Sequence, residues 1–251
     1  MDRAVRAHAG GDRGRRRDPH PAVTPVIEHH HADVSGGWLR AATFGAMDGL
    51  VTNIALIAGV GGAQVSRHAL ILTGVAGLVA GAISMGIGEY TSVRTQNEQI
   101  AAELGKELHE LRVNPDGEAD ELVAMWVARG LPAGLARQVA DVLKRNPDQA
   151  LRVHAQEELG VVPDELPSPW TAAGSSFVCF SVGAVIPLLT LLMGYDNLWA
   201  ALAVGGLGLF AAGAVVSRLT LRAWWLGGLR QLVLGAVAAG LTYLIGSLIG
   251  V

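Results

Sequence analysis

The sequence contains a single cysteine, Cys179, which excludes an internal disulfide framework. Because Cys179 lies in an apolar run, we interpret it as a small buried hydrophobic residue. Charged residues are also scarce: they make up 16% of the 251 residues, whereas 51% are hydrophobic and 33 are glycine. This composition is too apolar for an ordinary soluble domain and indicates a protein that crosses a membrane several times.

The N-terminal part of the sequence lacks the apolar core of a signal peptide. Arg15, Arg16 and Arg17 suggest a twin-arginine signal, but no apolar segment follows them, so we reject that interpretation. We expect residues 1–37 to form a disordered cytoplasmic tail. The run His29–His31 could bind metal, although a solvated linker is the preferred interpretation.

Five stretches are long and nearly free of charge. Each approaches or exceeds the ~20 residues that cross ~30 Å of hydrocarbon as a helix. They cover residues 41–66, 69–88, 170–195, 197–217 and 231–251. Eight Lys and Arg lie between the second and third stretches, and three Arg lie between the fourth and fifth, whereas only Arg67 lies on the other face. By the positive-inside rule, the N-terminus and the segment between stretches two and three are cytoplasmic.

The polar segment 93–169 contains 14 Asp and Glu against eight Lys and Arg, and we expect it to be helical. The second apolar stretch is predicted to continue as one helix to about Leu111, because good helix formers follow it without proline. Asn–Pro pairs at 114–115 and 146–147 are typical of an N-cap and the first helical residue, and Gly130 marks another break. Three short helices are therefore predicted after the long one.

These features predict an all-α fold: a polytopic membrane protein with five transmembrane helices and a cytoplasmic helical insert between helices two and three. The expected organisation is a tail at 1–37, transmembrane helices one and two at 38–92, the insert at 93–169 and transmembrane helices three to five at 170–251.

An aspartate, Asp48, lies within the first apolar stretch. A charge at this depth costs about 2.5–3.5 kcal/mol on insertion scales, which favours a functional role over a neutral helix–helix hydrogen bond. Counted along ideal helices, Asp48 lies roughly 15 Å and Met85 roughly 10–14 Å from the cytoplasmic surface, with Glu89 one turn nearer to it. A carboxylate with a thioether suits a transition metal, although Met85 alone could be core filler and Glu89 an interfacial charge.

Acidic pairs recur in the insert. Glu107 and Glu110 share one helix face and Glu118 and Glu121 share another, and Glu103 extends the first face. Packed together across the turn at Asn114–Pro115, the two faces would form a carboxylate-rich metal site. His154, Glu157 and Glu158 could join it. The alternative interpretation is a set of solvated acidic helix faces.

Several motifs carry a family resemblance. They are DGLVTNIALIAGV, GLVAGAISMGIGEYTSVRTQ, the glutamate-bearing insert that ends in EELGV, and the PSP segment before the last three stretches. Together they resemble the vacuolar iron transporter family over nearly the whole chain after residue 37. The resemblance implies a homodimer with five helices per subunit, exchange of cytoplasmic ferrous iron or related divalent metals for protons, and a path along the dimer interface lined by the first helix.

Matched residue by residue, the resemblance assigns metal ligands in two places. It implies intramembrane ligands at Asp48 and Met85, and cytoplasmic ligands at Glu107, Glu110, Glu118, Glu121 and Glu158. The chain departs from the plant-type pattern at His154 and Ala155, which replace two methionines, so imidazole replaces a soft ligand pair. Met47, where asparagine is common, adds a possible second thioether.

We therefore expect a proton-coupled antiporter, not an enzyme, that exports ferrous iron or Mn, Co or Zn from the cytoplasm. The alternative is a membrane-anchored metal sensor or buffer that binds without transporting. The expected partners are divalent metal ions, protons, the lipid bilayer and a second copy of the chain, with no prosthetic group and no nucleic acid. A prokaryotic cytoplasmic membrane is the expected location, with a vacuolar membrane as the alternative. The candidate metal ligands are Asp48, Met85, Glu89, Glu103, Glu107, Glu110, Glu118, Glu121, His154, Glu157 and Glu158.

Overall fold

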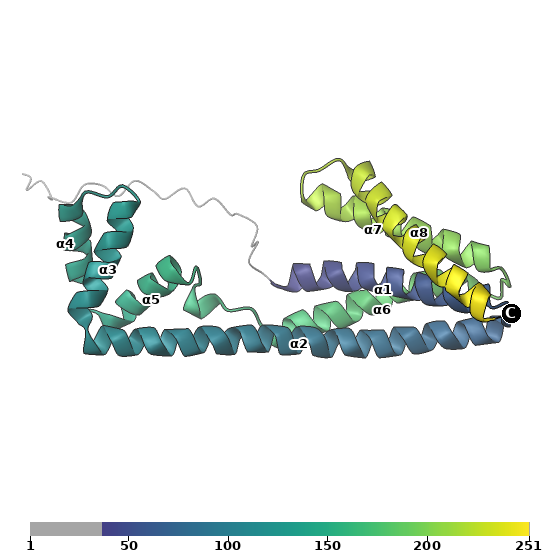
Figure 1. Ribbon diagram of the computed structural model, residues 1–251, viewed down its shortest axis with the longest axis horizontal. Helices are drawn as coiled ribbons and strands as arrows, with labels where there is room; N and C mark the ends of the chain where they lie inside the picture. The colour runs from purple at the N-terminus through teal and green to yellow at the C-terminus, as the bar shows by residue number, and fades with distance from the viewer. Residues whose placement is uncertain (1–36, 251) are drawn as a thin grey trace, which may run out of the picture. The chain divides into compact units, whose positions relative to one another are not determined.

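The computed structural model describes residues 37–250 (Figure 1). Within these residues the regular structure consists of eight α-helices and one short 3-10 helix, Pro163–Glu165, with no strand. The predicted all-α class is confirmed. The predicted tail lies outside the described residues, as does its run His29–His31, except that Gly37 already begins the first helix.

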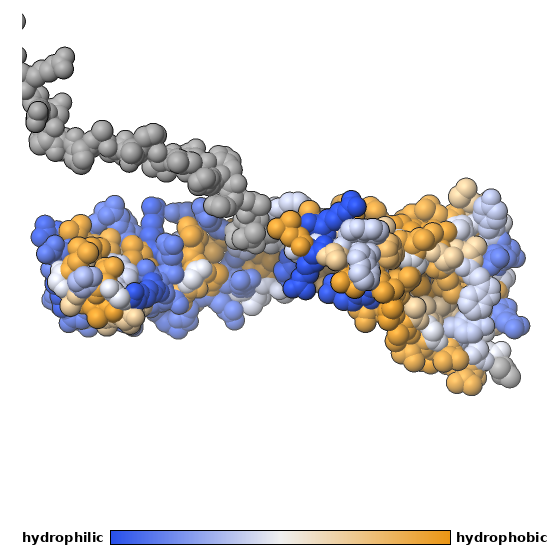
Figure 2. All heavy atoms as spheres, turned by 90° about the horizontal axis from the view of Figure 1, so that it is seen from above, coloured by the Kyte–Doolittle hydropathy of each residue, from blue (hydrophilic) through white to orange (hydrophobic). Residues whose placement is uncertain are grey.

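Five helices are long and apolar enough to cross a membrane, which confirms the predicted number of spans. They are α1 (Gly37–Gly62), α2 (Arg67–Val113), α6 (Pro169–Leu192), α7 (Leu198–Leu219) and α8 (Trp224–Ile249). Figure 2 shows hydrophobic side chains gathered over this part of the molecule, whereas hydrophilic and hydrophobic side chains are mixed over the helices of the insert. The chain is therefore a membrane protein.

Two helix boundaries differ from the charge-free stretches of the sequence. α8 begins at Trp224 rather than at residue 231, and α1 ends at Gly62 rather than at residue 66. The fifth apolar stretch was expected to start at residue 231 because Arg230 is charged. However, a long basic side chain near a helix end can extend to the membrane surface without interrupting the helix.

The 47-residue helix α2 is continuous, as predicted. Ser66 caps its first turn, with the side chain accepting a hydrogen bond from the Ala69 backbone, and the helix ends at Asn114. At 1.5 Å per residue it is about 70 Å long. Its first half packs on α6 and α1, and its second half carries the insert (Figure 1). One uninterrupted helix therefore joins the two parts in which metal ligands were predicted.

Glycines bring α1 into close contact with α6. A Cβ at Gly45 would lie 2.6 Å from the backbone oxygen of Ser176, and a Cβ at Gly49 would collide with the backbone of Phe180. The Asn53 amide on the same helix donates a 2.5 Å hydrogen bond to the carbonyl oxygen of Ala184. Small-xxx-small spacing permits such backbone proximity between membrane helices. α1 is thereby held in one rotational position, which decides where its neighbouring side chains point.

The insert contains three short helices, as predicted: α3 (Pro115–Ala128), α4 (Ala133–Leu143) and α5 (Pro147–Glu158). Asn114 and Asn146 cap α3 and α5 with a proline at the first position, and Gly130 adopts a positive φ of 97° after α3. Buried Ala119, Leu122 and Ala140 form the core of the insert. α3 and α5 both contact the second half of α2, so three helices meet there.

Candidate metal-binding sites

A cluster of carboxylates surrounds one histidine where α2, α3 and α5 meet. His154 of α5 has only 1% of its surface exposed. Its Nδ1 atom lies 2.8 Å from Glu158 Oε1, 2.9 Å from Glu107 Oε1 and 3.8 Å from Glu118 Oε2. The chain thus brings together one imidazole and three carboxylates from three helices.

The hydrogen bonds of this cluster are incomplete. His154 Nδ1 is aligned for a hydrogen bond with Glu158, whereas Glu107 Oε1 is within ion-pair distance but is not aligned for one. Glu107 Oε1 and His154 Nε2 are both buried without a hydrogen-bond partner among the described residues. Buried polar atoms are normally paired, so Glu107 Oε1, which faces the cluster, fits a site that is completed by a ligand.

Electrostatics in the cluster oppose the ionised carboxylates. Burial raises the pKa of Glu107 to about 7; His154 opposes this shift, and the neighbouring Glu158 and Glu118 add to it. Burial also raises the pKa of Glu118, again against the influence of His154 and with help from Glu121 and Glu110. A divalent cation would remove this repulsion, because it supplies positive charge at the point where the carboxylates converge.

Two overlapping sets of ligand atoms are close enough to hold one ion each, with all atoms of a set within 4.8 Å of one another. The first set is Glu107, His154 and Glu158, and the second is Glu107, Glu110 and Glu118. Carboxylate oxygen with imidazole nitrogen suits Fe, Mn, Co and Zn. Glu107 belongs to both sets, so it is the residue that the two candidate sites share. A cavity of about 170 Å³ opens beside it, between α2 and α5.

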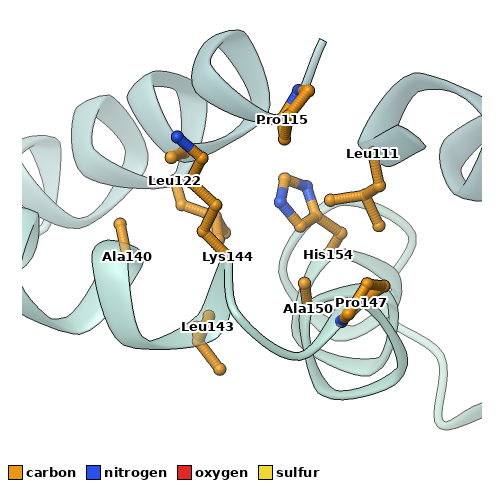
Figure 3. A pocket seen from close by; sticks show the side chains of 10 residues that line it. Leu111, Pro115, Leu122, Ala140, Leu143, Lys144, Pro147, Ala150 and His154 are labelled. Atoms are coloured by element: carbon orange, nitrogen blue, oxygen red, sulfur yellow. The ribbon is translucent and has the colours of Figure 1, made fainter. Parts of the chain in front are cut away.

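The surroundings of His154 hold its ring in place. Figure 3 shows the ring projecting from α5 among Leu111 of α2, Pro115 and Leu122 of α3 and Ala150 of α5. With Lys144, these mostly apolar residues line a hollow of only about 10 Å³. An imidazole fixed in this way presents Nδ1 to the carboxylates with little freedom to rotate. Such preorganisation lowers the entropic cost of binding an ion.

Three of the ligands predicted in the insert lie outside these two sets. Glu121 is exposed and acts on the cluster only through its charge on Glu118. Glu103 forms a 2.7 Å ion pair with Lys106 at the rim of the cavity. Glu157 accepts a 3.1 Å hydrogen bond from the Trp126 indole and pairs with Arg129, so it serves the packing of α5 on α3.

The intramembrane candidates line one groove between α1 and α2. This groove has a volume of about 320 Å³ and includes Asp48 of α1 and Met85 and Glu89 of α2. Thr52, one turn along α1, donates a long 3.4 Å hydrogen bond to Asp48 Oδ1. The structure therefore brings together a carboxylate, a thioether and a second carboxylate, as the helix-depth argument predicted. Other residues of the lining are Phe44, Thr52, Gly81, Ser84, Gly88, Ser92 and Phe180.

An arginine that was not among the candidate site residues contacts this groove. Arg40 Nη2 lies 3.0 Å from Glu89 Oε2, and the Glu89 side chain is only 8% exposed. The pair joins the first turn of α1 to α2 at the insert side of the groove. Met47, the possible second thioether, is elsewhere: Gln231 of α8 donates to its sulfur at 2.9 Å, and Met47 is not part of the groove lining.

The chain is similar to known proteins over most of its length. The VIT family matches residues 39–247. The chain is 38% identical over 155 residues to the vacuolar iron transporter of Acanthamoeba castellanii, covering 62% of this chain and 56% of that protein. It is 32% identical to vacuolar iron transporter 1 of Arabidopsis thaliana, over 67% of this chain and 68% of that protein. It is 30% identical to vacuolar iron transporter 1 of Oryza sativa subsp. japonica, over 86% of this chain and 88% of that protein. The chain is a member of the VIT family.

Proposed function

We propose that this protein is a proton-coupled transporter that exports ferrous iron, or related divalent Mn, Co or Zn, from the cytoplasm. The observation that carries the proposal is the groove between α1 and α2, where Asp48, Met85 and Glu89 line a single space. A lone intramembrane carboxylate has many explanations, but two carboxylates with a thioether in one groove form a ligand set for a soft or borderline divalent ion. The names of the relatives point the same way.

The insert supplies the first binding step in this proposal. Its carboxylates and His154 collect the ion, and the continuous helix α2 connects them with Glu89 and Met85. Glu89 lies between the insert and Asp48 along the groove, so it receives the ion next. Glu107, Glu110, Glu118, His154 and Glu158 hold the ion in the insert, and Glu121 and Glu103 add negative charge around it.

The carboxylates of the groove can also exchange the metal ion for a proton. In the groove, an ionised Asp48 can offset a divalent ion, and after the ion leaves it can accept a proton instead. Either partner lowers the cost of a bare carboxylate at this depth. Ion movement one way and proton movement the other way would thereby share one residue.

The proposed assembly is a homodimer in a prokaryotic cytoplasmic membrane, with the insert and both ends of the α7–α8 turn on the cytoplasmic side. The groove opens to the surface of the single chain beside exposed Phe44. A second copy placed against α1 would cover this opening and complete the path. The basic residues of the insert and of the α7–α8 turn support the orientation by the positive-inside rule.

A membrane-anchored sensor or buffer is the competing function, because the insert cluster alone could bind metal. The test is flux in proteoliposomes that contain a metal-sensitive dye and a pH-sensitive dye, with full-length protein. Metal flux accompanied by opposite proton movement supports the transporter, and its loss in Asp48→Asn assigns the groove. Asp196→Asn, in the exposed α6–α7 loop, is the matched control. Metal binding without any flux would support the sensor and refute transport.

A further inference from the structure

The turn between α7 and α8 is closed by a defined set of backbone hydrogen bonds. The Arg222 amide donates to the Ser217 carbonyl at 2.8 Å, and the Leu221 amide donates to the Arg218 carbonyl at 3.2 Å. Leu221 adopts a left-handed φ of 54°, as the residue after a helix end of this type does. The turn therefore holds Arg222 at a fixed place beside the end of α7.

The two helices are in backbone contact just inside this turn. A Cβ at Gly213 would collide with the Gly227 carbonyl, and a Cβ at Gly227 would collide with the Ser217 hydroxyl. Ser217 is only 6% exposed, and its hydroxyl lies directly against Gly227. The contact leaves this hydroxyl at the base of a cavity between the helix ends.

That cavity is basic. It has a volume of about 510 Å³, and its lining contains Arg222 and Arg230 but no aspartate or glutamate. Neither arginine forms an ion pair within residues 37–250. The lining residues are Val216, Ser217, Thr220, Arg222, Ala223, Leu226, Gly227 and Arg230.

The first turn of α8 adds further hydrogen-bond donors. Its N-cap residue, Ala223, has no side chain that could accept a hydrogen bond from the helix. The backbone amides of Trp224 and Trp225 are therefore left without a helical partner, and the N-terminal end of a helix carries partial positive charge. The cavity lining itself offers two guanidinium groups and the Ser217 hydroxyl as donors, beside the positive end of α8, and this set suits a phosphate group.

We propose that this cavity binds a phosphate group, supplied by the headgroup of an anionic phospholipid. Lipid is favoured over soluble anions because the turn ends two membrane helices and exposes apolar side chains. Leu221 is 96% exposed, and Trp224 and Trp225 are about half exposed, as expected of residues at a bilayer surface. Basic pockets between membrane helices on the cytoplasmic side bind anionic headgroups by this chemistry. Inorganic phosphate shares the chemistry and is separated from lipid by the experiment.

The proposal differs from the orientation role that the sequence assigns to the same arginines. Under the positive-inside rule alone, every arginine of the turn contributes equally through its charge, and no single position matters. A built site instead distinguishes Arg222 and Arg230 from Arg218. The Arg218 guanidinium lies over the Trp224 ring at 5.7 Å and is not part of the cavity lining.

The experiment uses the full-length protein in a neutral detergent, with native mass spectrometry to count retained lipid and thermal unfolding to measure stabilisation. Phosphatidylglycerol, phosphatidylcholine and inorganic phosphate are added at constant ionic strength. We expect phosphatidylglycerol to be retained and to raise the unfolding temperature, and phosphatidylcholine to do neither. Each basic residue near an anionic lipid is worth about fivefold in affinity, so Arg222→Ala with Arg230→Ala should weaken retention roughly 25-fold.

The controls make each outcome decisive. Arg218→Ala removes one charge from the same turn and should retain lipid like the wild type, whereas Arg222→Ala and Arg230→Ala should each weaken retention about fivefold. Arg222→Lys with Arg230→Lys keeps the charge and should retain part of the binding, which separates lost binding from misfolding. Equal losses from all three single alanine variants, or equal retention of phosphatidylcholine, would overturn the site. Stabilisation by inorganic phosphate without lipid retention would overturn the lipid as its source.

Discussion

The cluster in the insert and the groove between α1 and α2 both contain carboxylates, but the cluster contains more of them. In the insert, three helices bring carboxylates and one imidazole so close that burial raises the pKa of Glu107 to about 7. In the groove, the candidate ligands are Asp48, Met85 and Glu89, and Glu89 is already paired with Arg40. The closely packed, buried side chains of the insert would hold an ion tightly. The groove has fewer ligands, and one of them is already paired with an arginine, so it would release an ion more easily. The difference suggests a division between capture and passage.

The largest effect is expected from Asp48→Asn, which tests whether the groove is a path. The amide preserves the shape of the side chain but cannot offset a desolvated divalent ion. Removing one partner of a buried charge pair costs about 3 kcal/mol or more, so flux should fall at least about 100-fold. Proteoliposome flux measures the loss, and calorimetry on the same preparation should show unchanged metal binding by the insert.

Asp196→Asn is the control for this variant, because Asp196 lies in the exposed α6–α7 loop. Normal flux in the Asp48 variant would remove the distinction between the two sites. It would leave Asp48 as a neutral partner in helix packing.

Glu107→Gln should have the next largest effect, and it should act on the insert alone. Glu107 belongs to both ligand sets, so its loss removes a carboxylate from each. We expect affinity for Mn²⁺ to fall about 30-fold, since hydrogen bonds and contacts to a charged group are worth about 2 kcal/mol. Calorimetry measures this in the full-length protein. Glu157→Gln is the control, because it makes the same chemical change on α5. It should bind Mn²⁺ normally, because Glu157 contacts Trp126 and Arg129 rather than the cluster.

Equal losses in the two variants would mean that the acidic faces act through bulk charge. In that case the geometry around His154 would carry no specificity. The cluster would then be no different from other acidic helix surfaces.

Much of this architecture follows from local signals. The N-caps at Asn114 and Asn146 and the unbroken helix α2 are encoded by residues within a few positions of each feature. The Glu107 and Glu118 faces follow from helical periodicity with one intervening turn. These parts could be predicted because the relevant physics acts over a few residues.

The buried face of α5 also has a pattern in the sequence. Ala150, His154 and Glu158 are spaced by four and share a face, and the first two are buried against the other helices. Glu157 lies about 100° around the helix from Glu158, and so it meets α3 instead. Spacing from a buried histidine therefore distinguishes two adjacent glutamates.

The Arg40–Glu89 pair had no comparable signal. Its partners are 49 residues apart, and their contact depends on how α1 packs on α6 and α2. That packing is determined by glycines such as Gly45 and Gly49, whose neighbours become known only when the bundle is assembled. Long-range pairs of this kind are decided by tertiary packing.

Metal affinity at the insert should depend on pH. Below its pKa of about 7, Glu107 carries a proton that a metal ion must displace, so affinity at the insert should rise about tenfold per pH unit up to pH 7 and then level off. Calorimetry from pH 5.5 to 8.5 measures this rise. In Glu107→Gln the slope should become smaller, because only the raised pKa of Glu118 remains.

The same group predicts an opposite trend in metal-free stability. Its folded pKa of about 7 lies above the ordinary value of 4.5, so the folded state binds more protons than the unfolded state between these values. Stability should therefore be highest at low pH within this window and should fall as pH rises through 7. A metal-free unfolding temperature that rises with pH, and that does so equally in Glu107→Gln, would contradict this account of the cluster.

The smallest effect is expected from Arg40→Gln, which tests whether the pair at the groove restrains the ion. Arg40 neutralises Glu89, and an arriving cation must compete with its guanidinium for the same carboxylate. Because Arg40 is largely exposed, the pair is worth at most about 1 kcal/mol, so the KM for metal flux should fall by about fivefold or less. Arg40→Lys keeps a charge near Glu89 and should restore most of the wild-type KM. A KM that rises in the glutamine variant would mean that the pair organises Glu89 for the ion, and the groove would then resemble the insert in holding its ligands ready.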